Sequence, residues 1–458
     1  MKRSALIMTF ILIGITTNIA KAQPHGTCGV NLTWQLVDST LTISGNGKMY
    51  DYTLYYGSRP WDAYRDNIKI LVINSGVTAI GEHAFHQSFF LRSVTIPNSV
   101  TKLGRDAFFA CSSLTTIDIS NYILEIGRDA FAACSSLMSI NVDDNNPNYS
   151  SNDGVLYNKT ANTLICCPAG RTEPFAIPEF VTAIADYAFR NCRKLTSITI
   201  PSSVASIGIQ AFSLCTSMTA VNVATNNINY SSNDGILYNE SQDTLICCPA
   251  GKMGAVTIPN TVVTIIDYAF YFNQVLTAVI IPNSVDSVGF YAFSLCGNLK
   301  SLTIGSSVTE IGYGAFSYCY SLDSITCRAE EPLAIYYNMF YDVPLNARII
   351  IPCNTLSAYQ NSSWGDMFTN FIEDCAGIGS AGLDEKIKLY PNPVIDKFYV
   401  DCNDFLSIKI YDMSGKEVVT QEVNGKTEIN ISNLPKGIYT VSILSKNKII
   451  KNDKIVKL

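Results

Sequence analysis

The stretch LRSVTIPNSVTKLGRDAFFACSS (91–113) is followed directly by LTTIDISNYILEIGRDAFAACSS (114–136), and this tandem pair decides the fold. The dipeptide Ala-Phe recurs at 84, 107, 130, 188, 211, 269, 292 and 315. The steps are 23 residues, except for two of 58 that contain one unit plus an insertion of 35. A repeat of fixed length predicts stacked coils that bury one another's apolar faces.

Each unit has a local pattern that can be interpreted residue by residue. The stretch Leu-x-x-Val-x-Ile (91–96) alternates as a half-buried strand does. Gly104 permits a turn after a second short extended stretch. Ala107, Phe108 and Cys111 then follow at helical spacing, which predicts one apolar side of a short helix.

The repeat region consists of coils and two insertions. Eleven coils are predicted, starting at Ile68, Leu91, Leu114, Leu137, Thr172, Leu195, Met218, Met253, Leu276, Leu299 and Leu322. The insertions 145–170 and 226–251 are identical at 20 of 26 positions, so a larger block was duplicated with an offset of 81. Two short strands in the first, Val155–Tyr157 and Leu164–Cys167, with Asn-Asp-Gly turns, predict projecting hairpins.

These units resemble the leucine-rich repeats of BspA-like surface proteins, whose pattern is Leu-x-x-Ile-x-Ile-Pro, Val-x-x-Ile-Gly and Ala-Phe-x-x-Cys. Segments 28–52 and 59–61 resemble that family's N-terminal cap, and 327–371 resembles its C-terminal cap. The resemblance covers about Cys28–Asp374 and implies an α/β fold, a leucine-rich repeat β/α solenoid. Asn273 and Ser88 replace the motif cysteine, which should only loosen the ladder.

The last segment differs in composition from the repeats. AGIGSAGLD (376–384) is typical of a linker, and seven short strand-like runs follow it, which predicts a small all-β immunoglobulin-like sandwich. The motifs YPNPV (390–394), DMSGKEV (412–418), LPKGIYTV (434–441) and the terminal KIVKL resemble a type IX secretion sorting domain. The resemblance implies that residues 385–458 engage the type IX machinery and that the body is exported to the cell surface or released. An ordinary immunoglobulin-like binding module is the alternative.

The N-terminus reads as a secretory signal. Lys2 and Arg3 precede an apolar run, and Ala20 and Ala22 provide small residues before cleavage at Gln23. The alternative is an amphipathic or buried helix. No later stretch is apolar enough to span a membrane. The expected organisation is therefore signal peptide 1–22, N-terminal cap 23–67, solenoid 68–326, C-terminal cap 327–375, linker 376–384 and sorting domain 385–458.

Composition excludes several function classes. The net charge is −6, and because residues 1–23 and 385–458 each carry +3, the remainder carries −12. An acidic body argues against nucleic acid as a partner. Only three histidines exist, His25, His83 and His86, and no HExxH spacing, phosphate loop or nucleophile elbow occurs. We expect His83 and His86 to lie on the surface, and we predict no catalytic residue, cofactor or metal.

The fifteen cysteines fall into groups. The motif cysteines could be disulfides or metal ligands, but buried thiols fit better because stacked side chains point the same way; they are Cys111, Cys134, Cys192, Cys215, Cys296 and Cys319. The pairs 166–167 and 247–248 could form vicinal disulfides or a metal site, although copied hairpin residues are the simpler interpretation. A cap disulfide such as Cys327–Cys353 is expected, with connectivity open.

Two further features concern binding. Asp143-Asp144-Asn145-Asn146 resembles a calcium loop, but the second copy has Ala224-Thr225 there, which favours a solvated turn. The residue between the two inward positions of each strand should line the solvent face of the sheet. That row also contains Ile280, and its polar members form the candidate binding face: Thr95, Asp118, Asn141, Thr199, Asn222, Thr303 and Thr326.

The sequence therefore predicts a secreted cell-surface leucine-rich repeat protein that binds a host or microbial surface protein or glycan. Resemblance to BspA-like proteins implies adhesion, and no enzyme is expected. The alternatives are a secreted glycan-processing enzyme or accessory protein, and a structural envelope protein.

Overall fold

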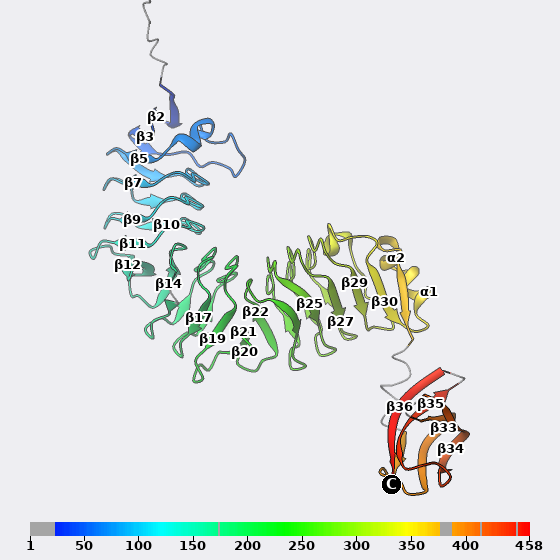
Figure 1. Ribbon diagram of the computed structural model, residues 1–458. Coiled ribbons are helices and arrows are strands. Elements are labelled where there is room, and N and C mark those ends of the chain that lie inside the picture. The colour runs from blue at the N-terminus through cyan, green and yellow to red at the C-terminus, as the bar shows by residue number, and fades with distance from the viewer. Residues whose placement is uncertain (1–22, 173–174, 376–386, 413–414, 446–447) are drawn as a thin grey trace, which may run out of the picture. The chain divides into compact units, whose positions relative to one another are not determined.

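The computed structural model describes residues 23–172, 175–375, 387–412, 415–445 and 448–458 (Figure 1). The chain divides into two compact units, with the boundary in the sequence after Arg171. Each unit contains coils whose parallel strands form two columns.

The first unit begins with a cap. Its strands β1 (His25–Gly29), β2 (Leu32–Val37) and β3 (Thr40–Gly45) pair in antiparallel fashion. β3 then pairs in parallel with β5 (Ile70–Ile73), the first strand of the repeats. The buried Trp61 stacks on Phe85 with ring centroids 5.4 Å apart, so the cap closes the end of the core.

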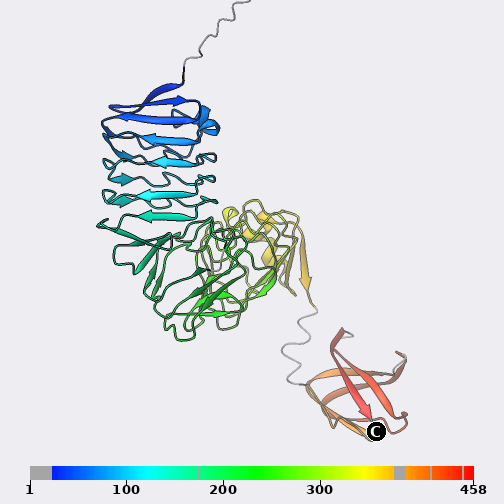
Figure 2. The same ribbon diagram turned by 60° about the vertical axis from the view of Figure 1, so that its left-hand side comes forward.

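The coils of the first unit lie one above another, as Figure 2 shows from the side. The first column contains β5, β7 (Ser93–Thr95), β9 (Thr116–Ile119) and β11 (Ser139–Val142). The second column contains β4 (Gly47–Lys48), β6 (Val77–Ile80), β8 (Lys102–Leu103) and β10 (Glu125–Ile126), all paired in parallel.

The second unit also has two columns of strands. Its first column consists of β15 (Phe175–Ala176), β17 (Ser197–Ile200), β19 (Ala220–Val223), β23 (Gly254–Thr257), β25 (Leu276–Ile280), β27 (Ser301–Ile304) and β29 (Ser324–Cys327). Its second column consists of β16 (Ala183–Ile184), β18 (Ser206–Ile207), β24 (Thr264–Ile265), β26 (Ser287–Val288) and β28 (Glu310–Ile311). Each of the eleven predicted coils thus has its strand, and the C-terminal cap adds β30 (Arg348–Pro352) and β31 (Phe371–Asp374).

The predicted short helix at each Ala-Phe motif is wrong. The motif forms a chain of turns, in which the N–H of Phe109 donates to Asp106 at 3.1 Å while the N–H of Phe108 donates to Ala130 of the next coil at 2.9 Å. Positive φ angles at Asp106 (53°) and Ala110 (57°) prevent a continuous helix. Alternate amides therefore join neighbouring coils. The described helices are η1 (Asp62–Asn67), η2 (Tyr337–Phe340), α1 (Leu356–Gln360) and α2 (Ser363–Met367).

Stacked phenylalanines form the centre of the core. In the second unit the ring centroids of Phe270 and Phe293 lie 4.4 Å apart, and those of Phe293 and Phe316 lie 5.2 Å apart. Phe316 stacks in turn on Phe340 of the cap at 5.2 Å. The recurring place of the aromatic ring thus produces a buried ladder of stacked rings within each run of consecutive coils.

The insertions contain three strands each, where two were predicted. They are β12 (Tyr149–Asn152), β13 (Val155–Asn158) and β14 (Thr163–Cys166), then β20 (Tyr230–Asn233), β21 (Ile236–Asn239) and β22 (Thr244–Cys247). The extra strand in each copy is Tyr-Ser-Ser-Asn, whose polar composition hides its strand character. A buried asparagine begins each insertion: the Nδ2 of Asn227 donates to Pro201 at 2.7 Å and to Val204 at 3.0 Å.

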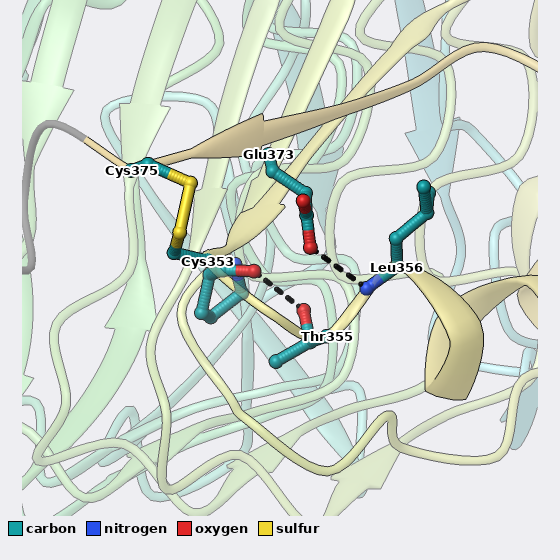
Figure 3. The surroundings of a disulfide bond; sticks show 6 residues. Cys353, Thr355, Leu356, Glu373 and Cys375 are labelled. Atoms are coloured by element: carbon teal, nitrogen blue, oxygen red, sulfur yellow. Dashed lines mark hydrogen bonds between the residues drawn. A yellow bond between two sulfur atoms is a disulfide. The ribbon is translucent and has the colours of Figure 1, made fainter.

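A disulfide closes the C-terminal cap, as Figure 3 shows. It joins Cys353 to Cys375, not to Cys327, so the predicted pairing is wrong although a cap disulfide is present. Cys353 and Cys375 follow the paired strands β30 and β31, which bring their Cα atoms to 4.6 Å. Cys327 is instead buried at the end of β29. The carboxylate of Glu373 accepts the N–H of Leu356 at 3.0 Å beside this bond.

The C-terminal segment is all-β, as predicted, but has five strands where seven short runs were expected. They are β32 (Lys388–Tyr390), β33 (Lys397–Tyr411), β34 (Glu417–Asn430), β35 (Gly437–Ser445) and β36 (Lys448–Lys457). All five pair in one antiparallel sheet around a core of its own that includes Phe398 and Ile408. A register shift between Cys402 and Leu406 lets two predicted runs join into β33.

Candidate binding surface

The predicted residues of the first unit lie on its first strand column. Asp118 on β9 and Asn141 on β11 lie opposite each other in register, and both are exposed. The Nδ2 of Asn141 donates to Oδ1 of Asp118 at 2.8 Å. Thr95, on β7, is exposed as well. Alternation along each strand explains the placement, because the flanking Ile117 and Ile119 are buried.

The second unit bears the remaining predicted residues, with one correction. Thr199 on β17 and Asn222 on β19 are exposed and in register. Thr326 is half-buried, and Thr303 is buried, with 9% of its surface exposed. Thr303 lies between Ile280 and Thr326 in register, and neighbours about 4.8 Å away on both sides cover so short a side chain. Thr303 is therefore not available for binding.

Sequence reasoning missed part of this row. Ile350 on β30 and Ile372 on β31 continue it in the C-terminal cap, and Ile372 is 42% exposed. With Ile280, 41% exposed, they make this end of the row more apolar than expected. The cap departs from the 23-residue period, so no repeat signal marked them.

The row offers hydroxyl, amide and carboxylate groups at regular spacing along parallel strands. Such groups form many individually weak contacts of about 0.5–1.5 kcal/mol each. Within the described ranges, no group of three His, Cys, Asp or Glu side chains is arranged to hold a metal ion. The side chains of the row can donate and accept hydrogen bonds.

The motif cysteines are buried and hydrogen-bonded to the previous coil. The thiol of Cys134 donates to the carbonyl of Phe108 at 3.1 Å, and that of Cys296 donates to Phe270 at 3.2 Å. The same contact recurs at Cys111, Cys215 and Cys319. Burial raises the pKa of Cys319 to about 12, which disfavours the reactive thiolate form. In the insertions, burial also raises the pKa of Cys247 to about 12.

The two neighbouring histidines are buried, which corrects the expected surface position. His86 stacks on Phe109 with centroids 4.8 Å apart, and burial together with Arg59 lowers its pKa to about 4. Arg59 forms a 2.6 Å ion pair with Asp62 and donates to the carbonyl of His83 at 3.2 Å. These groups join the N-terminal cap to the first coil, and sequence spacing alone did not reveal that role.

The calcium-like segment is a turn. Oδ1 of Asp143 accepts the N–H of Asn145 at 2.8 Å, and Asp144 is exposed. The buried Asn146 occupies the place that Asn227 has in the second copy, with its Nδ2 donating to Ser120 at 2.8 Å. The repeated residue is thus the structural asparagine rather than the carboxylates.

The predicted cleavage site lies at the edge of the described chain. Gln23 is exposed and accepts a 3.4 Å hydrogen bond from Gln35, whereas Ala20 and Ala22 lie outside the described residues. In the part that the structure describes, no helix has the length and apolar character needed to cross a membrane.

Comparison with known families gives two matches. The model of the BspA type leucine rich repeat region matches in six copies, over residues 63–169, 166–243 and 246–365. The secretion system C-terminal sorting domain matches residues 388–457. The sorting domain identifies the chain as a type IX substrate, exported through the outer membrane to the cell surface or beyond.

Solved structures of similar proteins exist, whereas no curated protein matches the chain. A leucine rich cell surface protein from Faecalibacterium prausnitzii is 24% identical, with 76% of this chain and 94% of that chain covered and a TM-score of 0.42. A leucine-rich repeat protein from Eubacterium ventriosum is 23% identical, with 70% of this chain and 93% of that chain covered and a TM-score of 0.38. The pneumococcal vaccine antigen PcpA is 16% identical, with 76% of this chain and 98% of that chain covered and a TM-score of 0.41. The repeat family model matches well over half of this chain's length, so the chain belongs to the BspA type leucine-rich repeat family.

Proposed function

We propose that this secreted surface protein is a non-catalytic adhesin that binds a host or microbial protein or glycan through the exposed row of its first strand column. The observation that carries the proposal is the alignment of exposed polar side chains in register, as in Thr199 and Asn222. Export to the surface places that row where such partners are found.

The regular spacing of the row allows many weak contacts whose free energies add along its length. A strand spacing of about 4.8 Å gives a regular series of hydrogen-bonding groups. No single contact needs to be strong, because several contacts of about 1 kcal/mol together give useful affinity. Organisation of the chain as cleaved signal, caps, solenoid 68–326, linker and sorting domain is part of the same proposal.

A binding assay with the purified body, residues 23–375, tests the proposal. The body is applied to a panel of extracellular-matrix proteins and to a glycan array, and saturable binding is measured. A double variant, Thr199→Lys and Asn222→Lys, should weaken that binding. A matched control, Ala205→Lys, changes an exposed residue outside the row and should not. Turnover of a glycan or peptide by the body would instead establish the enzyme alternative.

A further inference from the structure

A groove lies in the second unit where the second insertion interrupts the repeats. Its volume is about 470 Å³. In the second strand column β18 pairs with β16, whereas β24 pairs with β22 of the insertion. The two coils on either side are therefore separated, and their strands and turns form the groove walls. The volume lies within the range of about 300–1,000 Å³ that is usual for ligand sites.

Apolar side chains form most of the groove surface. Ile209 is 61% exposed and Phe290 is 51% exposed, although both are large and apolar. Tyr271 meets Tyr268 edge-to-face with centroids 5.5 Å apart, and Tyr268 stacks on Tyr291 at 5.5 Å. Large apolar side chains exposed around a concave surface are typical of binding sites.

The charged groups of the groove are all acidic. Asp267 and Glu310 line it, and none of the lining residues is Lys, Arg or His. Asp267 is fixed, because its Oδ1 accepts the N–H of Phe290 at 2.7 Å. Glu310 is exposed on β28, and no described residue forms a hydrogen bond or ion pair with its carboxylate. The groove thus presents negative charge beside apolar surface, with one carboxylate available.

The duplicated block shows that the fold does not require this chemistry. Residues 81 positions earlier in the sequence differ at several lining positions, among them Arg128 for Ile209, Asp129 for Gln210 and Arg190 for Tyr271. The Ala-Phe motif that forms the coil is unchanged, as at Phe212, which corresponds to Phe131. At these three positions the second copy therefore has two fewer cations and one fewer carboxylate, and Ile209 and Tyr271 stand in place of the arginines.

We propose that this groove binds a peptide segment of a partner protein that inserts one aromatic or large aliphatic side chain and carries a lysine or arginine beside it. The apolar side chain packs against Ile209, Phe290 and Tyr271, and the cation pairs with Glu310. The groove's mainly apolar surface favours such a peptide over a neutral glycan, which needs hydrogen-bonding partners along its length. The inference rests on the proposed binding function but assigns it a second, separate surface.

A selection experiment tests the assignment with the full chain. Random dodecapeptides displayed on phage are selected on the chain and depleted on its Ile209→Arg variant, which restores the residue type of the first copy. We expect the enriched peptides to combine an aromatic or aliphatic residue with Lys or Arg. Fluorescence anisotropy of one enriched peptide should then show affinity at least about tenfold weaker for Ile209→Arg and about two- to fivefold weaker for Glu310→Gln.

Controls separate this inference from the strand row. Thr257→Arg changes an exposed residue of the first column in the same unit and should leave peptide affinity unchanged. Equal circular dichroism of all variants shows that the fold is intact. The inference is overturned by any of three results: no enrichment, enrichment of acidic peptides, or a neutral glycan that binds the chain but not Ile209→Arg. Failure here leaves the Thr199 and Asn222 test unaffected, because the variants differ.

Discussion

Removal of the disulfide Cys353–Cys375 should destabilise the C-terminal cap selectively. The bond closes a sequence separation of 22 residues. The chain-entropy model assigns such a loop about 3 kcal/mol of stabilisation, because the cross-link restricts the unfolded cap. The bond also holds β31, the last strand of its sheet, to the chain that follows β30. The double variant Cys353→Ala, Cys375→Ala should therefore lose about 3 kcal/mol of cap stability.

Tryptophan fluorescence during urea unfolding measures this loss. The chain has three tryptophans, and the buried Trp364 is the one in the C-terminal cap, where its indole donates to Leu333 at 2.8 Å. Trp34 and Trp61 are buried in the first unit and report on the other cap. In repeat proteins stability is approximately local. For an m-value of about 1.5 kcal/mol/M, the urea midpoint of the Trp364 transition should fall by about 2 M in the double variant.

A Trp364→Phe background provides the control, since only the N-terminal transition then remains visible. The cysteine substitutions should leave that transition in place. If the urea midpoint of the Trp364 transition changes by less than about 0.5 M, or if both midpoints change equally, the prediction is wrong. In either case the disulfide would not act on a local cap.

Three further predictions concern buried groups. Asn227→Ala should cost about 2–4 kcal/mol in denaturant unfolding, because its side chain satisfies two carbonyls and the amides of Asn229 and Tyr230. His86, neutral when folded with a pKa of about 4, should destabilise the first unit as the pH falls from about 6.5 to 4, since the unfolded state binds the proton first; melting of His86→Phe across this window should show a smaller loss, because the buried His83, whose pKa is also lowered by burial, remains. Iodoacetamide should label Cys134 of the native chain only at the unfolding rate, as peptide mass spectrometry would show.

The sequence predicted the repeating features of the fold well. A 23-residue period with alternating apolar residues requires stacked parallel strands, and every predicted coil contains one. The helix at each Ala-Phe motif could not be excluded from spacing alone. Its absence follows from hydrogen bonds such as that from Phe108 to Ala130, which exist only after the coils have stacked.

The nonrepeating features were harder to predict. The disulfide partner of Cys353 depends on the pairing of β31 with β30, which lies outside the period. Burial of Thr303 depends on its neighbours in register. The groove beside Ile209 arises where the insertion separates two coils, so its shape appears only in the folded structure.

The most direct test of the central claim is a binding isotherm of the full chain on its best partner from the matrix-protein and glycan panel. We expect saturable binding that Thr199→Lys with Asn222→Lys weakens at least about tenfold, while Ala205→Lys leaves it unchanged. Binding that all three proteins show equally would contradict the assignment of the exposed strand row as the adhesive surface.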